Sequence, residues 1–164
     1  MSNAQLNEVT AVTHRAEKKT NVLSPERLAA LQRVGILYAR IALGAAFLSA
    51  VADRFGFWGK YGGWGNFATF TTYTGQVNSF MPKFLIPFLA WTATIAETSF
   101  GIGLILGLWL RWVALGTALL LFLFGTAMTI SFGIKSPLDY SVFSASGAAL
   151  LLAMSPKREP NQHS

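Results

Sequence analysis

The middle of the chain consists of long apolar stretches separated by short polar breaks. A membrane-spanning helix needs about 20 mainly apolar residues, and four stretches meet this requirement, at residues 34–52, 84–106, 112–132 and 138–154. Gly107 is suited to end the second helix, with a tight turn leading to the third. Upstream, Ser24-Pro25-Glu26 combines a capping residue, a proline at the first helical position and an acid in the first turn. The first helix is therefore expected to begin before the membrane.

A different pattern occupies residues 53–83, between the first two spans. Apolar side chains recur there at steps of three or four, namely Trp64, Phe67, Phe70, Tyr73, Val77 and Phe80. This spacing predicts a helix with one apolar face that lies flat at the outer membrane surface. Two compatible interpretations are an aromatic anchor at headgroup depth and a lid over a pocket that opens to the outer leaflet.

The composition supports a membrane location. Hydrophobic residues make up 52% of the 164 residues and charged residues 12%, whereas soluble domains usually contain roughly 25% charged residues. So short a chain cannot bury this much apolar surface in a soluble core. We therefore expect an all-α integral membrane protein, with a bundle of four transmembrane helices at residues 24–154. Residues 1–23 are expected to be a disordered basic cytoplasmic tail, and residues 155–164 a second cytoplasmic tail.

The distribution of lysine and arginine predicts the orientation. Four spans place both termini on one side of the membrane, and that side has eight of the 13 basic residues, against four on the other side. An excess of basic residues is typical of the cytoplasmic side. This predicts cytoplasmic termini, an outer loop at residues 53–83 and a location in the cell (inner) membrane. Because the net charge of +6 arises mostly from this bias and from the basic tails, a nucleic-acid partner is not expected.

Ligands for redox metals are missing from the predicted spans. The chain has no cysteine, and its two histidines, His14 and His163, lie in the tails. Haem and iron–sulfur clusters depend on such ligands, and no phosphate loop or dinucleotide fingerprint occurs. We expect no metal, haem or flavin site, so any electrons must come from a partner.

Glu97 is the only charged residue in the apolar stretch 84–110, near the middle of the second span. A charge at the bilayer centre costs roughly 2.5–3.5 kcal/mol, so Glu97 is expected to face the bundle and either to pair with a base or to stay protonated. Arg40 in the first span is the expected partner. Small residues lie on the same helix face as each charge, Gly44 beside Arg40 and Ala90, Ala93, Thr94 and Gly101 beside Glu97, and they let the two helices approach closely. The pair either fixes the register of the bundle or forms a ligand or proton site.

Five other residues are candidates for ligand binding. Asp53 and Arg54 end the first helix, either as a solvated pair or, together with Lys83, as the rim of a pocket. Ser136 to Asp139 has the spacing of a capping box, so Asp139 is expected to cap the fourth helix, with ligand binding as the alternative. Tyr140 lies at the same depth and is the last candidate pocket residue.

Two segments resemble the DoxX-like family of membrane proteins. Residues 40–48 with Asp53-Arg54-Phe55-Gly56 are similar to the first helix of that family. The segment from Glu97 to Leu104, with Gly107 and Arg111, is similar to its second-helix signature, an acid followed by glycines and a closing arginine. The resemblance extends over about residues 34–154. Residues 50–54 read AVADR where many members have a glycine and then a lysine. Arg54 keeps the positive charge at this place, but a site that requires lysine would lack it.

The resemblance implies a quinone-linked role. The family includes the membrane subunit of thiosulfate:quinone oxidoreductase and is named for a subunit associated with a terminal quinol oxidase. It implies that this chain binds quinone while a partner subunit supplies electrons, with Arg40 orienting the site and Glu97 transferring the proton. Two alternatives are a non-enzymatic adaptor or assembly factor, acting in a homo-oligomer or a larger complex, and a small transporter or proton path.

Overall fold

The computed structural model describes Gln5 and residues 24–155, so nearly all of the two predicted tails lies outside the described residues. The chain divides into two compact units, residues 1–35 and 36–164. Apart from the helix start at Ser24, every contact discussed below lies within the second unit. The described part of the chain consists of helices and turns and contains no strand.

Three helices of the described part are long and apolar enough to cross a membrane. They are α2 (Pro25–Arg54), α4 (Ile86–Leu106) with the preceding 3-10 helix η2 (Lys83–Leu85), and α5 (Leu110–Phe132). The predicted start of the first helix is confirmed, because the Ser24 hydroxyl oxygen accepts a hydrogen bond of 3.4 Å from the Arg27 backbone N–H. Gly107 is confirmed as the C-cap of α4, with a left-handed φ of 73° that glycine adopts without steric cost.

The predicted fourth span is divided into two helices, α6 (Lys135–Asp139) and α7 (Val142–Ala153). Ser141 lies between them with a φ of 55°, a left-handed conformation that interrupts the helix. The 12 residues of α7 extend about 18 Å, less than the roughly 30 Å of a bilayer core. The predicted capping box is wrong, because α6 begins at Lys135 and already includes Ser136. Asp139 instead forms an ion pair with Lys135, one helical turn away.

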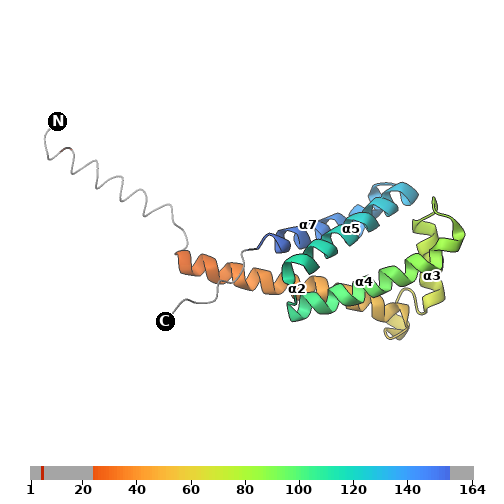
Figure 1. Ribbon diagram of the computed structural model, residues 1–164, viewed down its shortest axis with the longest axis horizontal. Helices are drawn as coiled ribbons and strands as arrows, with labels where there is room; N and C mark the ends of the chain where they lie inside the picture. The colour runs from red at the N-terminus through yellow and green to blue at the C-terminus, as the bar shows by residue number, and fades with distance from the viewer. Residues whose placement is uncertain (1–4, 6–23, 156–164) are drawn as a thin grey trace. The chain divides into compact units, whose positions relative to one another are not determined.

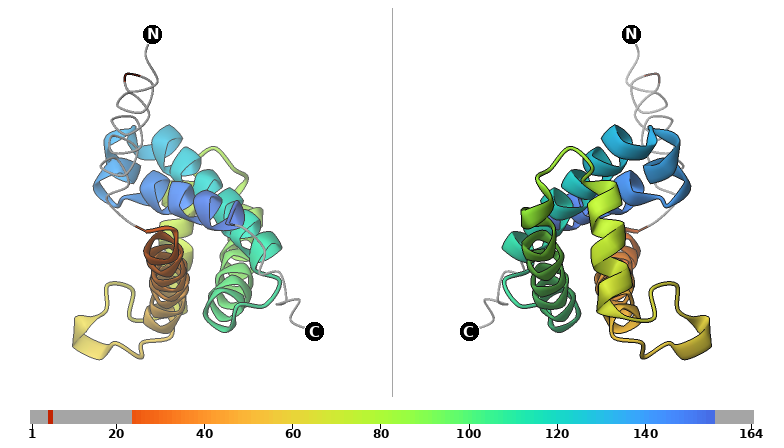
Figure 2. Two further views of the ribbon diagram at one scale, coloured as in Figure 1. Left: turned by 90° about the vertical axis from the view of Figure 1, so that its left-hand side faces the viewer. Right: turned by 90° about the vertical axis from the view of Figure 1, so that its right-hand side faces the viewer.

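The helices of the second unit enclose a common core. α5 and α7 lie side by side and cross α4 obliquely (Figures 1 and 2). α3 (Phe67–Val77) lies across the end of the unit where α4 begins and α5 ends, and it contacts both helices (Figure 1). The short 3-10 helix η1 (Gly59–Tyr61) lies in the loop before α3. The core consists of side chains from α2, α4, α5 and α7: Leu43, Phe47, Leu104, Ala114, Ala118, Leu121, Ala149, Leu152 and Ala153.

The backbones of α2 and α4 approach each other closely at a pair of glycines. A Cβ atom on Gly44 would lie 2.8 Å from the Gly101 carbonyl oxygen, so the two backbones touch there. The predicted small-residue face of α4 is confirmed, since Ala90, Ala93, Thr94, Glu97 and Gly101 are all buried. This contact sets the register between the two antiparallel helices.

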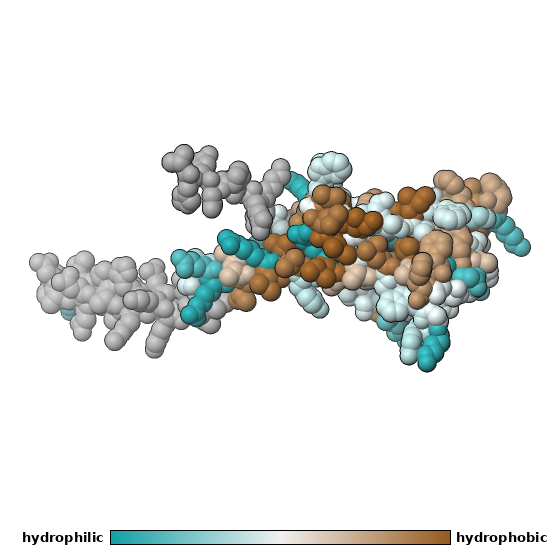
Figure 3. All heavy atoms as spheres, turned by 90° about the horizontal axis from the view of Figure 1, so that it is seen from below, coloured by the Kyte–Doolittle hydropathy of each residue, from teal (hydrophilic) through white to brown (hydrophobic). Residues whose placement is uncertain are grey.

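Large apolar side chains remain exposed on the outside of the long helices, among them Ile41, Phe88, Ile95 and Phe122. Figure 3 shows apolar residues gathered along the helices on one face of the molecule. An apolar outer surface of this kind is typical of helices that face lipid, and it agrees with the predicted integral membrane protein.

Candidate functional site

Glu97 is buried in the face of α4 that meets α2, with 2% of its surface exposed. Its partner is Arg54, the last residue of α2, which is 4% exposed. The Nη2 atom of Arg54 donates to both carboxylate oxygens of Glu97 at 2.7 Å, a distance typical of a charge-assisted hydrogen bond. The predicted buried arginine–glutamate pair is thus confirmed, with a different arginine.

Arg40 does not pair with Glu97, so the predicted partner is wrong. Its Nε and Nη2 atoms donate to the carbonyl oxygens of Leu104 and Ile105, at 2.9 and 3.0 Å. These carbonyls belong to the last turn of α4, where backbone acceptors have no partner within the helix. The guanidinium of Arg40 also fills the space beside Gly107, where even a Cβ atom would clash with it. Arg40 therefore caps the negative end of α4.

The direction of the side chains explains why Arg54 pairs with Glu97. With Gly44 opposite Gly101, Glu97 lies level with Leu48 of α2. Arg54 follows Leu48 by six residues, about 9 Å along the axis, and helical side chains lean toward the N-terminus of their helix. Arg54 therefore leans back toward Glu97, whereas Arg40 leans away from it, toward the end of α4.

Two other residues enclose the guanidinium of Arg54. Nη1 donates to the Thr94 hydroxyl oxygen at 2.9 Å, and this hydroxyl donates in turn to the Ala90 carbonyl at 2.8 Å. The ring of Phe70 lies over the guanidinium, 3.8 Å from its central carbon to the ring centroid, which is a cation–π contact. The Nε atom of Arg54 is buried and has no hydrogen-bond partner among the described residues. The site therefore retains one N–H for an acceptor oxygen.

Asp53 faces away from this pair and holds the loop before α3. Its Oδ2 atom accepts hydrogen bonds from the backbone N–H groups of Gly63 and Trp64, at 2.9 and 3.1 Å. Gly62 packs so closely against the carboxylate that a Cβ atom there would clash. The solvated Asp53–Arg54 pair considered from the sequence is not formed. Asp53 instead positions the loop that leads to α3.

The other candidates lie apart from the pair. Lys83 is exposed in η2 and lines a groove to which neither Arg54 nor Glu97 contributes. Asp139 and Tyr140 are exposed at the end of α6. Of the seven residues proposed from the sequence, the structure thus brings Arg54 and Glu97 into direct contact.

Sequence reasoning did not identify Thr94 or Phe70 as part of the site. Thr94 was identified only as a member of the small-residue face, and Phe70 only as one of several rings in an apolar stripe. The positions of the glycines in α2 and α4 determine the register between the two helices, and this register brings Arg54 and Thr94 close together. No signal in the sequence indicated which ring of α3 covers the guanidinium.

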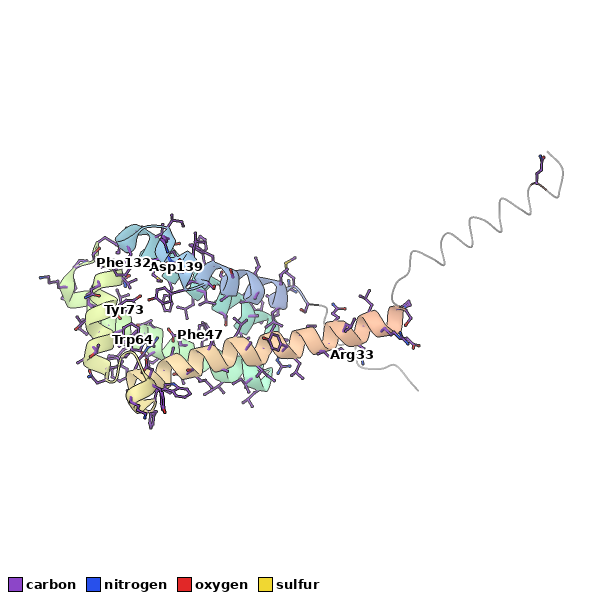
Figure 4. All side chains as sticks on the ribbon, turned by 180° about the vertical axis from the view of Figure 1, so that it is seen from behind. Arg33, Phe47, Trp64, Tyr73, Phe132 and Asp139 are labelled. Carbon is purple, nitrogen blue, oxygen red and sulfur yellow. The ribbon has the colours of Figure 1, made fainter. Side chains whose placement is uncertain are left out.

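Aromatic rings cover the pair on the side of α3. Phe70 contacts Trp64 edge-on and Phe67 at a tilt, with centroids 5.5 and 5.9 Å apart. Trp64 contacts Tyr73, which reaches Phe132 of α5, and the three lie at the same end of the bundle (Figure 4). Burial raises the pKa of Tyr73 above its ordinary value, with a smaller contribution from Tyr140. α3 thus packs directly over Arg54 and covers the pair on this side.

The family model described as DoxX matches residues 35–131 of the chain. The matched region contains Arg40, Arg54 and Glu97 and ends in α5, before Asp139 and Tyr140. No curated protein and no solved structure matches the chain.

Proposed function

Because the chain belongs to the DoxX family, we propose that it is the quinone-binding subunit of a membrane redox complex. The supporting observation is the buried Arg54–Glu97 pair, in which the Nε atom of Arg54 has no acceptor among the described residues. Buried donors are nearly always hydrogen-bonded in proteins, so an unpaired one marks a place for a ligand oxygen. A partner subunit supplies the electrons, since this chain has no cysteine for a cluster or thiol.

The donor set fits a quinone. A bound quinone exchanges two electrons and two protons, and its carbonyl oxygens accept hydrogen bonds. Arg54 would hold one carbonyl oxygen through Nε, and Glu97 would exchange a proton through a carboxylate oxygen that now accepts from Arg54. Phe70 covers the guanidinium, so a ring that approaches from this side must displace Phe70. In this proposal α3 is the lid of the site.

The proposal includes the arrangement in the membrane. α6 and α7 together provide the fourth crossing, with the break at Ser141 inside it. The excess of basic residues on the side of the termini supports a cytoplasmic location for both ends if the chain crosses four times. The site then lies toward the outer side of the inner membrane, beneath α3.

Gentle extraction from the native membrane, followed by chromatography of extracted lipids and identification of co-purifying proteins, tests this function. We expect stoichiometric quinone with the wild-type chain and a loss of at least tenfold in Arg54→Gln and Glu97→Gln. Asp139→Asn is the matched control, because it makes the same change in the exposed pair with Lys135. Wild-type protein that binds neither native quinone nor quinone analogues would overturn the proposal, as would full binding by both site variants.

A second function, assembly factor or membrane adaptor, is favoured by a different observation. Both carboxylate oxygens of Glu97 already accept from Arg54, so this pair is also suited to a purely structural role. An assembly factor would co-purify with partner subunits and without quinone. Its Glu97→Gln variant would lose the complex and the stability of the bundle together.

A further inference from the structure

The outward face of α3 has a groove that the proposed quinone site does not use. Two hollows, of about 620 and 500 Å³, adjoin each other on this face, and Thr72 and Gln76 line both of them. One extends over Trp64 and Asn66 before α3, and the other lies between α3 and Lys83. The opposite face of α3, with Phe70, is the one that packs onto Arg54.

Three side chains of the groove have hydrogen-bond donors that meet no acceptor in the described part of the chain. Lys83 and the Gln76 amide make no hydrogen bond or ion pair in the described part of the chain, and both side chains are exposed. Asn66 uses only its carbonyl oxygen, which accepts from Thr69 in the helix cap, so its amide N–H groups remain available. No carboxylate lines either hollow. Such a lining is complementary to an anion that bears additional oxygen atoms.

The other wall of the groove is apolar and leads into the membrane. Met81, Ile86 and Pro87 line it beside Lys83. Phe84 in η2 and Phe88 in the first turn of α4 follow and are 79% and 68% exposed. Lys83 itself begins the segment that is long and apolar enough to span the bilayer, which places it where lipid headgroups lie. A ligand of this groove therefore has an anionic head and apolar chains.

We propose that the groove binds an anionic phospholipid with a hydroxyl-bearing headgroup. Lys83 binds the phosphate, and the Gln76 amide donates to headgroup oxygens that extend along α3. The Thr72 hydroxyl donates to the Ala68 carbonyl, so its oxygen accepts from a headgroup hydroxyl. The acyl chains lie against Phe84 and Phe88. A zwitterionic lipid has no net charge to pair with Lys83, and free phosphate has no acyl chains to contact the apolar wall. Both should therefore bind more weakly than an anionic phospholipid.

Lipid retention by the full chain tests this site. The protein is placed in nanodiscs of phosphatidylcholine with increasing phosphatidylglycerol, and bound lipid is counted by native mass spectrometry after release into detergent. Wild-type protein should retain phosphatidylglycerol in preference to phosphatidylcholine. Lys83→Gln should weaken this retention about fivefold, the contribution expected of one lysine near anionic lipid, and Gln76→Leu should weaken it further.

Lys60→Gln is the matched control, because Lys60 lies in η1 over the ring of Tyr61 and not in the groove. Equal losses in Lys60→Gln and Lys83→Gln would show diffuse attraction and overturn the site. Equal retention of both lipids by wild-type protein would also overturn it, as would equally tight binding of inorganic phosphate. Thermal unfolding of each variant confirms that the exposed substitutions leave the fold intact, and quinone binding in pure phosphatidylcholine nanodiscs is expected to be unchanged.

Discussion

Removing one member of the Arg54–Glu97 pair, and then both, separates its role in stability from its role in ligand binding. Glu97→Leu leaves a buried guanidinium with Thr94 as its remaining hydrogen-bond acceptor. Breaking a buried pair in this way costs about 3–5 kcal/mol of unfolding free energy. Arg54→Met should cost less, because a carboxyl group can take up a proton and become neutral whereas guanidinium stays charged.

The double variant Arg54→Met/Glu97→Leu has no buried charge at this position. Replacing a buried pair by apolar residues of similar volume is often neutral or stabilising by about 1–4 kcal/mol. The double variant should therefore recover the loss seen in Glu97→Leu, with a coupling energy of about 3 kcal/mol or more. Reversible unfolding of the four proteins in mixed micelles, followed by circular dichroism, measures these differences.

The same cycle on Lys135 and Asp139 is the control, since this exposed pair one helical turn apart should couple by about 0.3–0.5 kcal/mol. A double variant at Arg54 and Glu97 that is no more stable than Glu97→Leu would refute the reasoning. The 2.7 Å contacts between the two side chains would then contribute no coupling energy to the stability of the fold. A stable double variant is also informative for function. If it still binds quinone as wild-type protein does, the quinone site lies elsewhere.

Arg40→Met removes two hydrogen bonds from a charged donor to the end of α4. It should lower the unfolding free energy by about 1.5–3 kcal/mol. An unchanged unfolding free energy in the same assay would show that other donors replace these two hydrogen bonds. Gly44→Ala should destabilise the bundle, because its Cβ would lie 2.8 Å from the Gly101 carbonyl oxygen, whereas Gly147→Ala, with open space around it, should be neutral or stabilising. Tyr73 should ionise above its ordinary pKa of 10.0 because of burial. Above pH 10 the unfolded chain therefore loses this proton first, and stability falls as the pH rises. Unfolding measured as a function of pH should show a smaller decline in Tyr73→Phe.

The ends of the long helices could be predicted because local residues determine them. Ser24 with Pro25 starts α2, and Gly107 ends α4 through a backbone conformation that other residues avoid. The buried face of α4 was also predictable, since its small residues recur at helical spacing. These features depend on neighbours within one helix, and such neighbours are visible in the sequence.

The partner of Glu97 could not be found from depth alone. Arg40 was favoured because it lies inside an apolar stretch, but depth along one helix does not specify its register against another. The contact of Gly44 with Gly101 sets that register, and the backward lean of helical side chains then selects Arg54. The two glycines and the direction of helical side chains are both known from the sequence. The contact between the two glycines is known only from the packed structure.

The break in the fourth apolar stretch had no local signal. Ser141 adopts a left-handed φ, a conformation that is uncommon outside glycine, asparagine and aspartate. Pro137 is compatible with the first turn of α6 and does not by itself end the helix. The continuous hydropathy of residues 138–154 therefore predicted one helix where the structure has two.

The two proposed sites lie on opposite faces of α3, so their ligands should compete. Phe70 must leave Arg54 before a quinone ring enters from that side, and the groove beside Lys83 exists with α3 in its present position. A phospholipid in the groove thus favours the closed lid and should weaken quinone binding. By thermodynamic reciprocity, bound quinone should weaken phospholipid binding by the same factor. Quinone affinity should therefore be lower in phosphatidylglycerol nanodiscs than in phosphatidylcholine nanodiscs for wild-type protein, and the difference should vanish in Lys83→Gln. Equal affinities in both lipids, with phosphatidylglycerol demonstrably bound, would show that quinone reaches Arg54 without movement of α3.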